Sequence, residues 1–434
     1  MTGAATEPAR RRRSEGLPAG VYLLGFSLFA MGSAEFLLAG VLPAVAADLG
    51  VTLTSAGFLI TAFAIGVVVG GPPFAVLSLR WPRRTALVAT QAVFAVSIAC
   101  GLLGNYQILL VTRVAAGVAY AGFFAVAAVT AISLARPERS ARASGVVVSG
   151  LSVAMVAGGP AGTLLGHFTE WRAGFWAVVV LTITAMIGCL RGIPARSPGR
   201  HPTAAPTISR ELVTMRDPRL WVVYAITILT TAAYMITYNY LAAMLEDIAG
   251  LPGFWIPAVL ALFGAGAFLG LSLGGRISDH RPHLALLTGA VATLALSAVL
   301  VAAIHHPATA VPTVFVLGIA AFVLNPALYG RVFSIAAQAP TLAGATTVSA
   351  FQLGISITPV LAAVPLSHGA ALTSVCLVGA GLAAAAVPLI LRDRRSHAGT
   401  SRARCRTAPP HGRIPSGAGG DPPQRPGEDR AHSA

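Results

Sequence analysis

The segments AVLSLRWPRR (Ala75–Arg84) and GRISDHRPH (Gly275–His283) are short basic turns at equivalent places in the two halves of the chain. Each follows an apolar run long enough to cross a bilayer, and each carries a proline at the same place relative to the preceding helix. This echo indicates two related groups of membrane helices joined by a linker.

The composition is that of a membrane protein. Of the 434 residues, 55% are hydrophobic and 10% are charged, and a water-soluble domain could not bury so much apolar surface. The formal charge is +15, but there is no lysine, and most arginines stand in short clusters between apolar runs rather than along one face, so nucleic-acid binding is not expected. The four cysteines show no paired spacing, so the sequence predicts no disulfide framework, no metal site and no cofactor.

Apolar stretches of about 20 residues predict twelve spanning helices and an all-α integral membrane fold. The predicted spans are 20–42, 55–79, 85–104, 108–134, 143–166 and 173–192, followed by 220–245, 253–277, 283–304, 308–332, 343–366 and 370–391. The expected parts are a cytoplasmic tail (1–19), a six-helix bundle (20–192), a cytoplasmic linker (193–219), a second six-helix bundle (220–391) and a disordered tail (392–434).

The placement of arginine predicts the topology. If the twelve helices alternate in direction, the arginine clusters fall on one side of the membrane, and Arg172 is the only arginine in the opposite loops. By the positive-inside rule the arginine-rich side is cytoplasmic, and both termini are there. We therefore expect a multi-pass protein of the cytoplasmic (cell) membrane, surrounded by the lipid bilayer.

Two charges lie deep inside the predicted helices. Glu35, in MGSAEFLLAGVLP (Met31–Pro43), is the only acid well inside a span, and Arg113 in the fourth span is the matching arginine. The rise of a helix places them at similar depths, roughly 11 Å and roughly 8 Å from the outer helix ends. Because unpaired charges in hydrocarbon are strongly unfavourable, we expect them to face one another or a wet cavity. Such a pair can exchange protons, and a purely structural ion pair or a protonated acid is the alternative.

The fifth span contains SGLSVAMVAGGPAGTLLG (Ser149–Gly166). Its glycines permit close approach of another helix, and Pro160 removes a backbone hydrogen bond. A kink is therefore expected in the outer half of this helix.

A longer stretch, Met31 to Pro72, resembles the opening of bacterial drug:proton antiporters of the major facilitator superfamily. RVAAGVAYAGFFAVA, VAGGPAGTLLG, WRAGFWAV, ALFGAGAFLG and GGRISDHRP extend the resemblance over roughly residues 20–390. The chain looks most like the chloramphenicol-resistance exporters of actinobacteria. This resemblance implies the major facilitator fold, in which two six-helix halves rock around a site near the membrane midplane.

The resemblance also implies roles for individual residues. It implicates Arg113, together with Gly117, in proton transfer. It further assigns a motif associated with exporters rather than importers to Gly158, Gly159, Pro160 and Gly162.

A cytoplasmic gate is implied at the two basic turns. Leu79 stands where the family has an aspartate in the first turn, and Pro82 where it has a glycine, so the second-half copy alone keeps the aspartate. The residues implied for this gate are Arg80, Arg83, Arg84, Gly275 and Asp279.

A substrate site is expected between the halves, lined by aromatic side chains and a few polar ones. The fourth, seventh, tenth and eleventh spans supply candidates, for each of which helix packing is the alternative: Tyr120, Phe123, Tyr234, Tyr238, Asn239, Asn325 and Gln352. As a set they suit a neutral, moderately apolar ligand with an aromatic ring better than a sugar.

The expected function is proton-coupled efflux of a small amphipathic antibiotic, chloramphenicol or a close analogue, which would confer resistance. The expected partners are the drug and protons, and the chain is expected to act as a monomer. Proton-coupled export of a sugar or another metabolite is the alternative within transport, and a membrane receptor, scaffold or enzyme is the alternative outside it. An enzyme would need clustered acids, histidines or cysteines, and ATP-driven transport would need a GxxxxGK loop, and the sequence has neither.

Overall fold

The structure is a computed structural model that describes residues 17–77, 81–135, 139–194, 214–336 and 340–407. Across these ranges the regular secondary structure is helical, and twelve helical stretches are long and apolar enough to cross a membrane. The predicted all-α fold with twelve spans is confirmed. The chain forms two compact units, Met1–Asp393 and Arg394–Ala434, and every contact reported below lies within the first.

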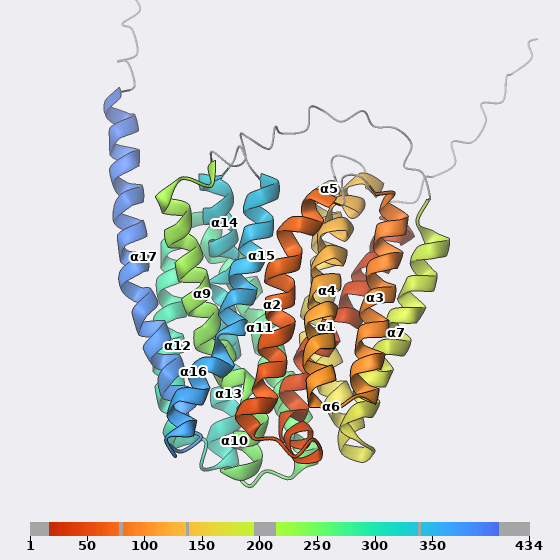
Figure 1. The fold of residues 1–434 in the computed structure, drawn as a ribbon. Helices are drawn as coiled ribbons and strands as arrows, with labels where there is room; N and C mark the ends of the chain where they lie inside the picture. Colours follow the sequence, from red (N-terminus) through yellow and green to blue (C-terminus); the bar gives the residue numbers. More distant parts are fainter. Residues whose placement is uncertain (1–16, 78–80, 136–138, 195–213, 337–339, 408–434) are drawn as a thin grey trace, which may run out of the picture. The chain divides into compact units, whose positions relative to one another are not determined.

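The first six spans and the last six stand side by side as two groups (Figure 1). The first group comprises α1 (Ala19–Asp48), α2 (Leu53–Leu77), α3 (Arg83–Leu103), α4 (Tyr106–Leu134), α5 (Ser140–Val153) with η2 (Ala154–Gly158) and α6 (Gly159–Phe168), and α7 (Trp171–Gly192). The second comprises α9 (Pro218–Asn239) with α10 (Leu241–Asp247), η3 (Gly253–Trp255) with α11 (Ile256–His280), α12 (Pro282–Ala303), α13 (Pro307–Val323) with α14 (Asn325–Ile335), α15 (Pro340–Ser356) with α16 (Thr358–Ser367), and α17 (Ser374–Thr407). The last helix continues beyond residue 391, where the last predicted span ends.

Prolines account for several helix interruptions. Pro160 lacks the N–H that would continue the helix, and the backbone before it widens into the π-helical turn η2. This turn is the form that the expected kink takes. In the second half, Pro326 and Pro359 stand in the first turns of α14 and α16, where a missing N–H is tolerated. Spans that look continuous in the sequence are therefore built from two helices.

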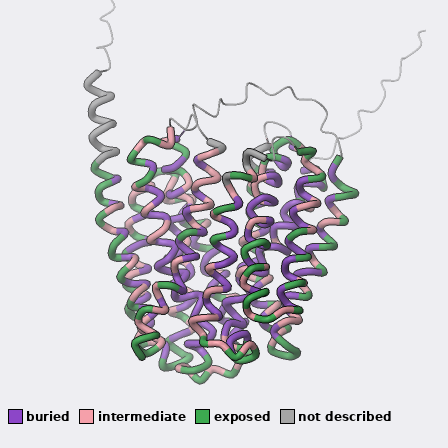
Figure 2. Tube along the Cα trace, viewed as in Figure 1, coloured by how far each residue is buried: buried purple, intermediate pink, exposed green. Residues whose placement is uncertain are grey.

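The outward faces of the helices are apolar. Val111 and Val129 of α4 are exposed, at 69% and 46%, and Leu273 of α11 is exposed at 46%. Figure 2 shows buried residues where helices face one another and exposed residues on the outside. Lipid chains are the medium in which such a surface is stable, because the exposed side chains are apolar and helices pair most of their backbone polar groups internally.

The two halves make contact along α2 and α15. At the end of the bundle that contains the α1–α2 turn, α1 also packs against α10, α6 against α11, and α2 against α16. The Thr61 hydroxyl of α2 donates to the carbonyl of Ser356, beside the α15–α16 interruption, at 2.8 Å. We refer to this end of the bundle as the closed end.

Candidate functional site

A cavity of about 320 Å³ lies between the two halves. Its walls come from α1, α4, α5 and η2 of the first half and from α9, α11, α13, α14 and α15 of the second. Within the whole fifth and eleventh spans, Arg142–Phe168 and Leu342–Ser367, the lining positions of α5, η2 and α15 fall between the middle and the end that lies away from the closed end, so the cavity extends in that direction. Its aromatic walls are formed by Phe36, Tyr120, Phe124, Tyr234, Phe268, Phe322, Tyr329 and Phe351.

The lining positions follow the helical period. On α5 and η2 they are residues 148, 151, 152 and 155; on α11 they are 264, 267, 268 and 271; on α15 they are 348, 351, 352 and 355. Positions spaced by three and four residues lie on one face of a helix, so each helix presents a single stripe to the cavity. Sequence reasoning missed most of these apolar residues. If one lining residue of each helix is known, counting three and four residues along the helix identifies the others.

The structure brings together four of the seven predicted substrate residues. Tyr120, Tyr234, Asn325 and Gln352 line the cavity, whereas Phe123, Tyr238 and Asn239 are absent from its walls. Phe123 is fully buried in helix packing, and the Tyr238 ring packs against Phe36 and Phe263, with ring centroids 6.3 Å and 4.9 Å away. The Asn239 amide donates to the Thr358 hydroxyl at 2.9 Å, joining the α9–α10 interruption to the start of α16.

Glu35 is the single carboxyl group among the residues that line the cavity. Gln352 of α15 lies on the opposite half of the protein, with its side chain within hydrogen-bonding reach of the Glu35 carboxyl group. The field of Arg113 also acts on Glu35. An acid in this position is accessible to the cavity and links the two halves through a polar contact.

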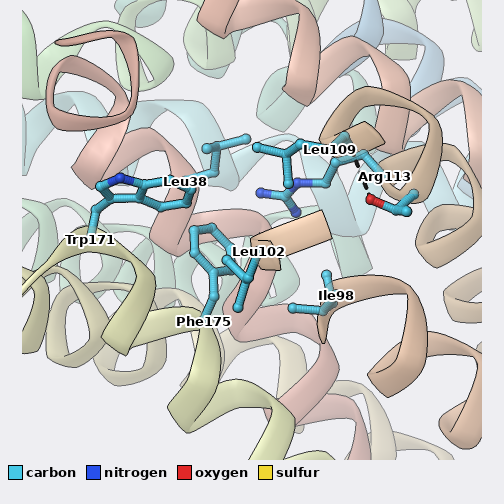
Figure 3. Close-up of a pocket in the computed structure, with 8 residues that line it drawn as sticks. Leu38, Ile98, Leu102, Leu109, Arg113, Trp171 and Phe175 are labelled. Atoms are coloured by element: carbon cyan, nitrogen blue, oxygen red, sulfur yellow. Dashed lines mark hydrogen bonds between the residues drawn. The ribbon is translucent and has the colours of Figure 1, made fainter. Parts of the chain in front are cut away.

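Arg113 lies inside the first half, in a small apolar pocket (Figure 3). Its side chain is 2% exposed, and its guanidinium carbon lies 4.9 Å from the ring centroid of Phe175 and 5.9 Å from that of Phe63. Its Nη1 donates to the Ala34 carbonyl at 3.3 Å, while Nη2 has no hydrogen-bond partner. Aromatic faces and one backbone carbonyl therefore hold the charge in place.

Of the two expected arrangements, a facing pair of charges or a cavity, the structure has the cavity for Glu35. Among the described residues no ion pair within 4 Å joins Glu35 to Arg113, and Glu35 lines the central cavity whereas Arg113 lines the pocket inside the first half. Counting residues gave the depth of each side chain but not the rotation of its helix. The two charges interact at longer range, with the backbone of α1 beside the arginine.

The glycines of the fifth span pack closely against α1 around Glu35. A Cβ atom added to Gly158 would overlap the Ser33 hydroxyl, and one added to Gly159 would lie 2.7 Å from the Phe36 Cβ. Real Cβ contacts are not that short, so only glycine permits this helix separation. A Cβ atom added to Gly162 would lie 2.8 Å from a Leu37 side-chain carbon. Pro160, in the same turn, is buried.

The predicted gate residues are spread over two helices. Arg83 and Arg84 begin α3, and Gly275 and Asp279 lie in the last turns of α11, with Asp279 exposed. None of these charged side chains belongs to an ion pair within the described ranges. Arg80 lies outside the residues that the structure describes.

One buried charge cluster was missed by the sequence reasoning. Asp393 of α17 is 3% exposed and receives two hydrogen bonds from Arg331 of α14, at 2.7 Å and 2.9 Å. His283 of α12 lies 3.0 Å from the same carboxylate. The predicted span ends at residue 391, so the sequence alone assigns Asp393 to the tail. In the part of the chain that the structure describes, no three His, Cys, Asp or Glu side chains gather as a metal site requires.

Sequence comparison identifies the family. The model of the Major Facilitator Superfamily matches residues 24–359. The "Chloramphenicol resistance protein" of Streptomyces lividans is 40% identical over 353 residues, which cover 81% of this chain and 90% of that protein. The "Inner membrane transport protein YdhP" of Escherichia coli (strain K12) is 28% identical over 373 residues, covering 86% and 95% of the two chains.

Solved structures share the fold. A mutant form of the nucleoside transporter NupG superimposes with a TM-score of 0.71 at 13% identity, covering 86% of this chain and 99% of that one. An inward-facing, occupied bacterial homologue of the human lysosomal transporter Spinster gives a TM-score of 0.67 at 17% identity, covering 92% and 100%. With the family match and the twelve membrane helices, these findings make the chain a multi-pass transporter rather than an enzyme. The chain belongs to the Major Facilitator Superfamily.

Proposed function

We propose that this transporter exports a small amphipathic antibiotic, chloramphenicol or a close analogue, across the cell membrane in exchange for protons. The observation that carries this proposal is the cavity between the halves, with its aromatic walls and the single carboxyl group of Glu35. Export would confer resistance on the cell. The Streptomyces relative, named for chloramphenicol resistance, supports the choice of drug.

The chemistry of the cavity favours an aromatic drug over a sugar. A cavity of about 320 Å³ is at the small end of the range for ligand sites, and most of its lining is apolar. A sugar would expose many hydroxyl groups to these walls, and each would lose its hydrogen bonds to water without replacement. A nitrogen- or oxygen-bearing aromatic compound needs few partners, and Ser152, Thr231, Asn325 and Gln352 are available.

Proton exchange is assigned to Glu35, with Arg113 as its electrostatic partner. Glu35 is accessible to the cavity and within the field of Arg113, so a change in its surroundings can alter whether it holds a proton. Arg113 keeps its charge and shapes that field from inside the first half.

We place both termini in the cytoplasm, on the strength of the arginine distribution. The closed end is then extracellular, and the cavity extends toward the cytoplasm, as an exporter requires when it takes up its substrate. In this scheme residues 20–192 and 220–391 are the two rocking halves, 193–219 link them, and one chain suffices for transport. The glycine motif of the fifth span serves as the pivot against α1, and the basic turns serve as the cytoplasmic gate.

Susceptibility testing and a transport assay together test the proposal. A drug-sensitive bacterial host that expresses the chain should tolerate more chloramphenicol than the host with an empty vector, and a protonophore should abolish the difference. In proteoliposomes, an imposed pH gradient should drive chloramphenicol uphill. Unchanged susceptibility despite good membrane expression would exclude this substrate, and export insensitive to the protonophore would exclude proton coupling.

A further inference from the structure

Two amide oxygens in the cavity wall lack hydrogen-bond partners. Asn325 is 7% exposed and Gln352 is 5% exposed, both line the cavity, and neither Asn325 Oδ1 nor Gln352 Oε1 has a partner. A buried polar atom without a partner is unfavourable, so such atoms are uncommon unless a ligand or water satisfies them. Both lie on the second half of the protein, on α14 and α15, whereas Glu35 lines the cavity from the first half.

The neighbours of these amides leave the oxygens, and not the nitrogens, for a ligand. Gln352 is within hydrogen-bonding reach of Glu35, and an ionised carboxylate can only accept, so the Gln352 NH2 group must face it. Asn325 is likewise within reach of the Tyr234 hydroxyl, and because Asn325 Oδ1 has no partner, its NH2 group is the one that donates to Tyr234. The groups that remain are therefore hydrogen-bond acceptors, and the ligand that suits them brings donors.

We propose that Asn325 and Gln352 bind hydrogen-bond donors of the substrate, and that Gln352 is the residue through which protonation of Glu35 weakens substrate binding. The substrate class is then a neutral aromatic compound that carries hydroxyl or amide N–H groups. This proposal rests on the proposed function and adds the polar recognition and the competition between proton and drug.

The competition between proton and substrate follows because the Gln352 side chain has a donor group, NH2, and an acceptor, Oε1. With Glu35 ionised, the Gln352 NH2 donates to the carboxylate and Oε1 is free for the substrate. With Glu35 protonated, the new O–H is a donor, and Gln352 satisfies it by turning its oxygen toward Glu35. The NH2 group then faces the cavity, and the substrate donor loses its acceptor. Acidification therefore weakens binding of a donor-bearing ligand.

Other ionisable side chains lie in the electrostatic surroundings of Glu35 or line the same cavity without producing this effect. They are Arg113 and Tyr120 of α4, Tyr234 and Tyr238 of α9, and Tyr329 of α14. The lining residues of α5, α11 and α15 include no charged side chain. When the pH falls from mildly alkaline values to the range in which a carboxyl group takes up a proton, guanidinium and phenol groups keep their protonation state, so the carboxyl group is the one that changes.

The first experiment varies the ligand. Equilibrium binding to the purified full chain is measured with chloramphenicol, which has two hydroxyl groups and an amide N–H, and with its diacetyl ester, in which both hydroxyl donors are blocked. The Kd of the ester should be at least about fivefold higher, because one or more net hydrogen bonds are lost. Equal affinity for the two probes would overturn the donor requirement.

The second experiment varies the protein. Gln352→Leu should raise the Kd for chloramphenicol about fivefold at mildly alkaline pH and should leave it independent of pH, whereas the Kd of the unaltered chain rises on acidification. Gln91→Leu is the matched control, since Gln91 of α3 is a buried amide with an unpartnered oxygen outside the cavity. It should keep both the affinity and the pH dependence.

Each result has a distinct meaning. If Gln352→Leu retains the pH dependence of the unaltered chain, Glu35 and substrate do not compete through Gln352 and the proposal is wrong. If the unaltered chain binds no chloramphenicol, the proposed substrate fails and this inference fails with it. If Gln352→Leu and Gln91→Leu both melt at the temperature of the unaltered chain, misfolding is excluded as the cause of a change in Kd.

Discussion

Arg113 binds the backbone of α1 at Ala34, with its Nη1 3.3 Å from the Ala34 carbonyl oxygen, directly before the acid in the sequence. The guanidinium also lies over the Phe175 ring, 4.9 Å from its centroid, so contacts other than Glu35 hold it. Glu35 is free to face the cavity. In the proposed exchange, a proton arrives at or leaves Glu35 while the arginine keeps these contacts.

Arg113→Lys should slow pH-driven export of chloramphenicol by about tenfold, because an ammonium group cannot stack as a planar guanidinium does while donating to Ala34. Initial rates in proteoliposomes measure this. Arg172→Lys is the control: Arg172 stacks on Trp171 and pairs with Asp48 away from the cavity. A full rate for Arg113→Lys would show that the planar guanidinium is not needed.

Glu35→Gln should abolish uphill export driven by a pH gradient, because a glutamine amide does not gain or lose a proton at any pH used in the assay. Exchange of labelled for unlabelled drug at equal concentrations should continue, since it needs no net proton movement. Comparing the two assays on the same vesicles separates coupling from binding. Retention of gradient-driven accumulation would remove Glu35 as the coupling residue.

Gly158→Ala should destabilise the protein by roughly 1–3 kcal/mol, because its new Cβ overlaps the Ser33 hydroxyl across the α1–η2 contact. The melting temperature of the purified protein reports this change. Gly145→Ala, in the neighbouring α5, has open space around its Cβ and should melt like the unaltered chain. Adding Ser33→Gly to Gly158→Ala should recover much of the loss, and no recovery would mean that the close contact is not the cause.

Asp393→Asn should lower stability by about 3 kcal/mol, because Arg331 is buried and would lose its carboxylate partner. Asp48→Asn breaks the exposed pair with Arg172, and its effect should stay below about 1 kcal/mol. Thermal unfolding of the two variants side by side tests the contrast. Equal melting temperatures would show that the α14–α17 contact contributes little.

Phe351→Ala should affect substrate binding, whereas Phe123→Ala should affect stability. Phe351 lines the cavity, so its loss should raise the KM for chloramphenicol severalfold with little change in melting temperature. Phe123 is fully buried in helix packing, and truncation should cost about 3 kcal/mol or more in stability. Transport kinetics and melting temperatures of both variants test this contrast. A purely structural effect at Phe351 would place the drug elsewhere.

Twelve spans could be predicted from sequence because a bilayer demands about 20 apolar residues per helix, whatever the helix packs against. Four lining residues could also be proposed from sequence, because polar or aromatic groups are distinctive in an apolar span: Tyr120, Tyr234, Asn325 and Gln352. Their neighbours Phe268 and Phe351 could not, because an apolar side chain in a span fits lipid, packing and cavity equally well.

The helix count, the two-half organisation and the depth of Glu35 and Arg113 could be derived from the amino-acid sequence alone, since each depends on local composition and rise per residue. The three-dimensional packing was needed to show that Arg113 turns into the first half while Glu35 faces the cavity and Gln352. It was also needed to show that Asp393 is buried against Arg331. Both outcomes depend on how each helix is rotated about its axis, and that rotation is set by packing against helices distant in the sequence.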